Sequence, residues 1–192
     1  MQYIASAVVM TLIFCCLTHS VGADDAVSAG AKIAQQGTPK GATACMSCHG
    51  ADGAGLAAAG FPRLAGLDAG YLAKQIRDFQ LGTRSNPIML PIAKALNGEE
   101  IVAVSTYYST LPLPDNTLPD KQGPATQASA AEGKNLAQRG DWRARALPAC
   151  GPCHGLQGNG EGSHFPRIAG QQAGYIKSQL QAWKTGTRNN DA

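Results

Sequence analysis

Aromatic residues and long apolar runs are both scarce in this chain. Only 6% of its 192 residues are aromatic, which predicts a globular protein with a modest core. The longest apolar run, residues 4–17, falls short of the ~20 residues that a membrane-spanning helix needs. Basic residues are scattered along the chain instead of clustered, so the sequence excludes a nucleic-acid-binding patch and predicts no nucleic-acid partner.

Asp, Glu, Lys and Arg are absent from the first 23 residues. The small residues Val21-Gly22-Ala23 offer a cleavage site, and Asp24 begins a polar segment. This pattern predicts a secretory signal peptide over residues 1–23 and export to the periplasm. A retained membrane anchor is the alternative, because the start of the segment lacks Lys and Arg. Phe14 is too bulky for a lipoprotein cleavage site before Cys15.

Beyond residue 23, cysteine occurs only within two short motifs of the same pattern. The motifs are Cys45-Met46-Ser47-Cys48-His49-Gly50 and Cys150-Gly151-Pro152-Cys153-His154-Gly155. The pattern Cys-x-x-Cys-His is the attachment sequence of c-type haem. Each thiol adds to one vinyl group of the porphyrin, and the spacing lets one tight turn present both sulfurs to one edge of the ring. The adjacent histidine then becomes the proximal ligand of the iron.

The two motifs therefore predict two covalently bound haem c groups. The residues assigned to them are Cys45, Cys48, His49, Cys150, Cys153 and His154. Zinc is one alternative, because two Cys-x-x-Cys pairs can bind it, and disulfide bonds are another in an exported protein. Neither alternative explains why His and Gly follow each cysteine pair.

An internal repeat organises the rest of the chain. Phe-Pro-Arg-(Leu/Ile)-Ala-Gly follows each motif, and Pro62 recurs as Pro166, an offset of 104 residues. The same offset relates two Gly-Thr-Arg segments at 82–84 and 186–188. The repeat predicts a first domain over 24–112 and a second over 126–192, joined by an extended, proline-rich linker over 113–125. Because each domain has fewer than ~100 residues, a porphyrin would supply much of the apolar body against which its helices pack.

Apolar spacing predicts that both domains are helical. Opening helices are expected over 25–36 and 128–139, and a middle helix follows each motif. The middle helices carry a matching apolar stripe at positions i, i+4 and i+7: Leu72, Ile76 and Phe79 in the first domain, and Ile176, Leu180 and Trp183 in the second. Gly82 and Gly186 lie where a helix C-cap glycine belongs. The fold class is therefore all-α.

A last helix is expected in the first domain only. Asn97 and Glu100 have the spacing of a capping box. The apolar face that follows is formed by Ile101, Val104, Tyr108 and Leu111.

Methionine is scarce enough to limit the choice of a second axial ligand. Beyond residue 24 only Met46 and Met89 occur, and Met46 lies inside the attachment loop, where it cannot reach the opposite face of the haem. Met89 lies between the middle and last helices, where a loop could place its sulfur over the porphyrin; the alternative is a methionine that fills a core gap. His/Met ligation fills both axial positions and raises the reduction potential, which favours electron transfer over catalysis.

With these residues in hand, the chain resembles the two-haem periplasmic cytochromes c of the c4 subfamily. That resemblance implies two tandem class I cytochrome c domains that pass electrons toward terminal oxidases. It also implies that the carbonyls of Pro62 and Pro166 accept hydrogen bonds from Nδ1–H of the two proximal histidines. Arg84 and Arg188 would contact haem propionates; solvated charges at helix ends are the alternative for both.

The second domain departs from this family pattern. The repeat offset places the counterpart of Met89 at position 193, after Ala192. We therefore expect a C-terminally truncated sequence whose second domain lacks its C-terminal helix. An open or differently ligated second haem is the alternative. His164 is the spare histidine of the second domain, and it is expected at the surface instead of on the distal face.

The leading hypothesis for function is an electron carrier, not an enzyme. Its donor would be a quinol–cytochrome c oxidoreductase or a dehydrogenase, and its acceptor a terminal oxidase or reductase. Alternatives are an electron-entry haem subunit of a periplasmic dehydrogenase and a two-haem peroxidase-like enzyme, although neither domain shows a convincing set of distal acid/base residues. The first domain has no net charge and the second has +4, which suggests different partners or ordinary surface variation. Peripheral association with the membrane stays open.

Overall fold

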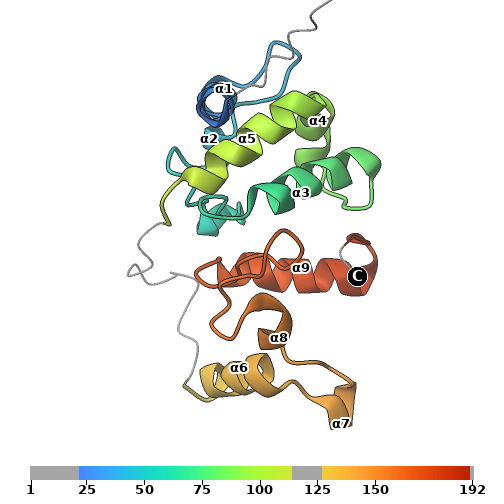
Figure 1. Cartoon of the computed structure of the whole chain (residues 1–192). Coiled ribbons are helices and arrows are strands. Elements are labelled where there is room, and N and C mark those ends of the chain that lie inside the picture. Colours follow the sequence, from blue (N-terminus) through green and yellow to red (C-terminus); the bar gives the residue numbers. More distant parts are fainter. Residues whose placement is uncertain (1–21, 114–126, 191–192) are drawn as a thin grey trace, which may run out of the picture.

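The computed structural model describes residues 22–113 and 127–190. The predicted signal peptide up to residue 21 and nearly all of the predicted linker lie outside these ranges. Figure 1 shows one group of helices for each repeat, with α3 and α9 facing each other at the boundary between the two halves. None of the described helices combines the length and the apolar character that crossing a membrane requires.

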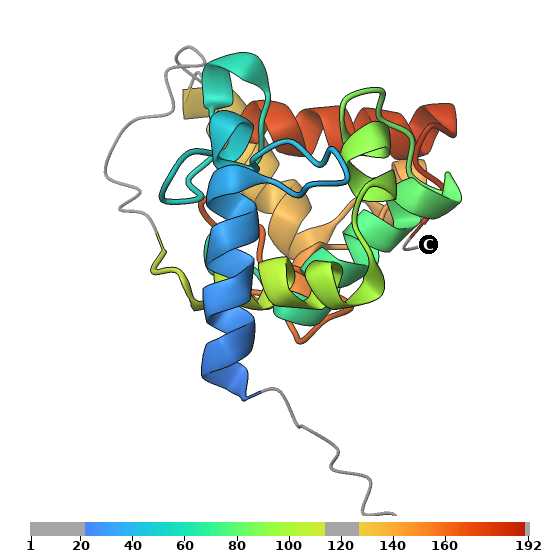
Figure 2. The ribbon, with the colours of Figure 1, turned by 90° about the horizontal axis from the view of Figure 1, so that it is seen from above.

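The first half is built from five α-helices and one short 3-10 helix. Their bounds are α1 (Ala23–Gln36), α2 (Met46–His49), η1 (Ala57–Ala59), α3 (Ala69–Leu81), α4 (Met89–Lys94) and α5 (Gly98–Thr110). Helix α1 crosses α5 closely, as Figure 2 shows in blue and yellow-green. The crossing is at Gly30, where an added Cβ would lie 2.7 Å from the Cβ of Tyr107. Glycine is required there because the two backbones approach so closely.

The core of the first half lies between α1, α3 and α5. Its predicted apolar faces are confirmed, since Leu72 and Phe79 of α3 and Ile101, Val104 and Tyr108 of α5 are all buried. The described residues form no β-sheet, only isolated bridges, of which three close loops and one joins the two halves; this confirms the all-α fold class.

The predicted helix ends are also present. Asn97 Oδ1 accepts a hydrogen bond from Glu100 N–H at 2.9 Å, and Glu100 Oε2 accepts one from Asn97 N–H at 2.8 Å. These two bonds complete the capping box of α5. Gly82 and Gly186 end α3 and α9 in the left-handed conformation, with φ of 80° and 74°.

The second half begins like the first and has one additional element. Its helices are α6 (Gln127–Arg139), α7 (Trp142–Arg145), α8 (Gly151–His154) and α9 (Ala173–Thr185). Helix α7 was not predicted from the sequence. This single turn lies in the segment between the opening helix and the cysteine motif, and its N-cap is Asp141, whose Oδ1 accepts from Ala144 N–H.

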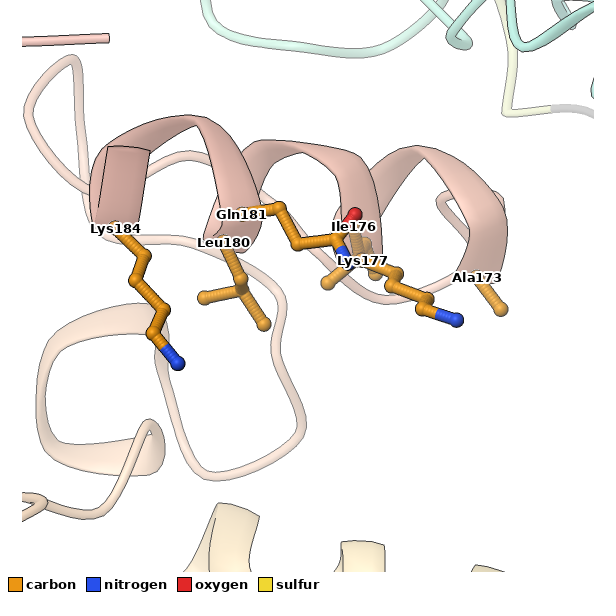
Figure 3. Close-up of a pocket in the computed structure, with 6 residues that line it drawn as sticks. All are labelled: Ala173, Ile176, Lys177, Leu180, Gln181 and Lys184. Atoms are coloured by element: carbon orange, nitrogen blue, oxygen red, sulfur yellow. The ribbon is translucent and has the colours of Figure 1, made fainter. Parts of the chain in front are cut away.

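One face of α9 lines an apolar groove of about 410 Å³. Figure 3 shows its lining side chains on one side of the helix: Ala173, Ile176, Lys177, Leu180, Gln181 and Lys184. The repeat equivalents of Ile176 and Lys177 are Leu72 and Ala73, which are buried in the first half. Helices α4 and α5 pack on α3 there. Among the described residues of the second half, no helix takes their place.

The two halves meet through side-chain and backbone hydrogen bonds. Gln171 Oε1 accepts from Arg63 N–H, and Gln171 Nε2 donates to Arg63 O, both at 3.0 Å. Arg63 is only 1% exposed, and its Nη2 donates to Ala169 O at 2.7 Å. The Phe-Pro-Arg segment of the first half is thereby fixed against the Ala-Gly-Gln segment of the second.

Candidate haem sites

Each cysteine motif forms a single helical turn. His49 N–H donates to Cys45 O at 2.9 Å, and His154 N–H donates to Cys150 O at the same distance. Within such a turn the two cysteines and the histidine lie close together, as attachment to one porphyrin requires. The four described cysteines form no disulfide bond with one another. In the described ranges, no group of three or more His, Cys, Asp or Glu side chains has an arrangement that could hold a metal ion by itself.

The proximal histidines have the hydrogen bonds that the resemblance implied. Nδ1 of His49 lies 2.9 Å from Pro62 O, and Nδ1 of His154 lies 2.8 Å from Pro166 O. Because a carbonyl only accepts, the ring N–H must be on Nδ1, which leaves Nε2 with a free lone pair. That tautomer is the one a haem iron needs, and both halves present it.

Burial keeps the first attachment site uncharged. His49 is 7% exposed, and this burial lowers its pKa, although the bond to Pro62 opposes the shift. Burial likewise raises the pKa of the Cys45 thiol to about 11. A neutral imidazole can coordinate iron, and a thioether carries no charge, so both residues fit a haem group in an apolar setting.

Met89 begins helix α4 instead of lying in an irregular loop, which corrects the sequence-based expectation. Asn86 Oδ1 accepts from Ile88 N–H and Met89 N–H, both at 2.9 Å, and so caps this turn. Pro91 is tolerated because it lies in the first turn of the helix, where no backbone N–H is needed. Met46 lies within α2, inside the attachment turn, as predicted.

The remaining residues named in the sequence analysis differ in their exposure to solvent. His164 is exposed, as expected. Arg84 and Arg188 are not solvated helix-end charges, because they are 8% and 3% exposed and lie between the two halves. Their backbones form an antiparallel bridge. Contact of Arg84 and Arg188 with haem propionates stays a prediction.

The contacts of Arg84 and Arg188 follow the repeat. Arg84 donates to Gln75 of its own half and to Tyr175 and Gln179 of the other. Arg188 donates to their repeat equivalents: Gln179 of its own half, and Tyr71 and Gln75 of the other. Sequence reasoning missed the tyrosines and glutamines. Their conserved spacing within the repeat was the available signal, since an offset of 104 residues links each pair.

Comparison with known proteins places these features in a family. Residues 27–112 match the cytochrome c family. A thiosulfate dehydrogenase electron acceptor of Stutzerimonas stutzeri is 51% identical over 163 residues, which cover 84% of this chain and 73% of the relative. A cytochrome c4 of Pseudomonas aeruginosa is 43% identical over 192 residues, which cover 100% of this chain and 86% of the relative.

Solved structures agree with these relatives. Reduced cytochrome c4 of Pseudomonas stutzeri has a TM-score of 0.70 at 29% identity, covering 88% of this chain and 84% of that one. A thiosulfate dehydrogenase of Marichromatium purpuratum has a TM-score of 0.75 at 45% identity and covers 84% of this chain. The present chain spans only about a third of that protein, 34% of its length.

The tandem attachment turns, the paired histidine–proline bonds and this degree of identity have one consistent explanation. The two curated relatives above are named as an electron acceptor and as a cytochrome c4, and both names describe electron transfer. The chain belongs to the cytochrome c family, within its di-haem cytochrome c4 group.

Proposed function

We propose that each half binds one haem c through its own attachment turn. Cys45 and Cys48 would anchor the first haem with His49 as proximal ligand. In the second half the corresponding residues are Cys150, Cys153 and His154. The observation that carries this assignment is the bond from each histidine Nδ1 to a proline carbonyl, at 2.9 and 2.8 Å. When bound, each haem supplies a one-electron Fe(III)/Fe(II) couple.

Met89 would coordinate the first iron on the face opposite His49. Its place at the capped start of α4 supports this role, because the cap restricts the backbone that carries the sulfur. A thioether ligand favours Fe(II) and so raises the potential at which the haem accepts an electron. If His49 and Met89 both held the iron, the first haem would be suited to electron transfer and would have no position left for a substrate.

We propose that the electron donor is a dehydrogenase that oxidises an inorganic sulfur compound, with thiosulfate dehydrogenase as the specific candidate. Two relatives of this chain are called thiosulfate dehydrogenase electron acceptors. The Marichromatium protein is a thiosulfate dehydrogenase, and its chain includes a region similar to this one. As electron donor, a dehydrogenase is therefore favoured over a quinol–cytochrome c oxidoreductase. A terminal oxidase is the proposed acceptor.

The remaining parts of the proposal concern organisation and location. The domains are proposed at 24–112 and 126–192, with the linker at 113–125 between them. Export by a signal peptide over 1–23 would place the protein in the periplasm, where haem c is attached. There the protein could also associate with the membrane surface.

A reduction assay tests the choice of donor. The oxidised di-haem protein is mixed with a thiosulfate dehydrogenase catalytic subunit, and haem absorbance is followed after thiosulfate is added. We expect fast reduction of both haems, and none when thiosulfate is omitted. A parallel assay uses quinol and a quinol–cytochrome c oxidoreductase. Fast reduction in the quinol assay alone would reject the dehydrogenase as donor, while a preparation without two haems per chain would reject the cofactor assignment.

A further inference from the structure

The backbone contact between the two halves lies immediately before the turn that carries Met89. Ser85 N–H donates to Thr187 O at 2.9 Å, and Asn189 N–H donates to Thr83 O at 2.7 Å. Arg84 and Arg188 lie between these two bonds. Segment 83–85 of the first half is therefore paired with segment 187–189 of the second.

Asn86 connects this pairing to Met89. Its side-chain oxygen accepts from Ile88 N–H and Met89 N–H, and its backbone oxygen accepts from Leu90 N–H at 3.0 Å. The chain from Ser85 to Met89 is thus a short, closed turn with little slack. A displacement of Ser85 would be passed to the first residue of α4.

The Arg84 side chain is the buried part of the same contact. Its Nη2 donates to the hydroxyl of Tyr175 at 2.5 Å and to Gln179 Oε1 at 2.7 Å. Both acceptors belong to α9 in the second half. The guanidinium also lies over the Phe79 ring, 4.7 Å from its centroid. Hydrogen bonds from a charged, buried donor are stronger than neutral ones, so these acceptors contribute strongly to the position of Arg84.

The opposite end of α4 has a different anchor. Gln80 Nε2 of α3 donates to Ala93 O at 2.8 Å and to Leu96 O at 2.9 Å, and Ala93 is completely buried. The C-terminal end of α4 is therefore held within the first half. Its N-terminal end, which carries Met89, follows a segment that the second half helps to hold.

We propose that the second half tunes the ligation of the first haem. Tyr175 and Gln179 position Arg84, the paired segments position Ser85, and Asn86 passes that position to Met89. The inference rests on the proposed role of Met89 as an axial ligand. Because residues that orient a ligand set the strength of its bond to the metal, a looser contact between the halves weakens the Met89–iron bond and lowers the reduction potential of the first haem.

A matched pair of variants on α9 tests this coupling in the di-haem protein. Gln179→Leu removes an acceptor of Arg84, whereas Gln181→Leu makes the same change two residues away, on the side of α9 that lines the groove. The first readout is the part of the methionine–iron absorbance band that Met89→Ala removes. The second is the midpoint potential of the first haem, and the third is the affinity for added imidazole, which competes with Met89 for the iron.

Gln179→Leu is expected to weaken that part of the band, lower the potential of the first haem and raise the affinity for imidazole severalfold. Gln181→Leu is expected to leave all three at the wild-type values. If Gln179→Leu does not yield folded protein, Tyr175→Phe removes a single hydroxyl acceptor and is measured in its place. Wild-type values in Gln179→Leu or Tyr175→Phe would overturn the coupling. If the Met89→Ala variant kept the full methionine–iron band of the wild type, Met89 would be rejected as a ligand. That result would be a separate failure, of the proposed function and not of the coupling.

Discussion

Arg84 and Arg188 pair their backbones across the boundary between the two halves, and each guanidinium reaches a tyrosine of the opposite half. Each also stacks on an aromatic ring of its own half, Phe79 for Arg84 and Trp183 for Arg188, with centroid distances of 4.7 and 3.9 Å. The two arginines therefore hold together elements of both halves at once. Their removal should affect the stability of the whole molecule more than that of one helix.

Arg84→Gln tests this contribution. The change removes charged hydrogen bonds to Gln75, Gln179 and Tyr175 in a buried setting, and we expect the free energy of unfolding to fall by about 2 kcal/mol. Urea denaturation measures the change. Arg77→Gln is the control, because Arg77 lies exposed on α3 and its loss should stay within about 0.5 kcal/mol of wild type. Equal effects of the two variants would show that the boundary contacts of Arg84 contribute nothing to stability.

Gly30→Ala tests the close crossing of α1 and α5. An added Cβ would lie 2.6 Å from the backbone carbon of Ala103 and 2.7 Å from the Cβ of Tyr107. The helices would have to move apart, which should cost about 1–3 kcal/mol in the free energy of unfolding. Gly98→Ala is the matched change, since nothing lies within 4 Å of an added Cβ at the start of α5. Thermal unfolding should show a lower midpoint for Gly30→Ala only; an unchanged midpoint would contradict the close crossing.

Asn97→Ala tests the capping box of α5. The variant loses the acceptor for Glu100 N–H, and a lost N-cap typically costs about 1 kcal/mol. Asn97→Asp retains a side-chain oxygen at the same place and should stay close to wild type in the same denaturation experiment. A loss of equal size in both variants would mean that the cap is not the cause.

Met89→Ala tests the proposed axial ligand of the first haem. We expect the methionine–iron absorbance band of that haem to disappear and its reduction potential to fall, because a thioether ligand that favours Fe(II) is lost. Met46→Leu changes the methionine of the attachment turn and should preserve both properties. Optical spectroscopy with redox titration distinguishes the two variants. A Met89→Ala protein with the wild-type band would assign the sixth ligand elsewhere.

Features that depend on neighbouring residues could be predicted from the sequence. The capping box needs only Asn97 and Glu100, and the apolar stripe of α3 needs only the spacing of Leu72, Ile76 and Phe79. The attachment turns are local as well, because each is contained in five residues. The histidine–proline bonds join positions 13 and 12 residues apart, and only the family resemblance implied them.

Features that depend on distant segments could not be predicted in the same way. The burial of Arg84 results from contact with residues more than 90 positions away, such as Tyr175, and no local pattern distinguishes it from a solvated arginine after a helix. Helix α4 was missed because Pro87 and Pro91 surround Met89 and favour a loop interpretation. Helix α7 was missed because a four-residue turn leaves no periodicity to detect.

The reciprocal contacts of the two arginines give the boundary an approximate two-fold rotation axis, like that of an isologous homodimer whose subunits share one polypeptide. Two residues near this axis contact both arginines: Gln75 accepts hydrogen bonds from Arg84 and Arg188, and so does Gln179. A substitution at one position therefore disturbs its counterpart as well. We expect positions 71 and 175, 75 and 179, and 84 and 188 to change together in evolution, so that neither half can diverge at this surface without the other.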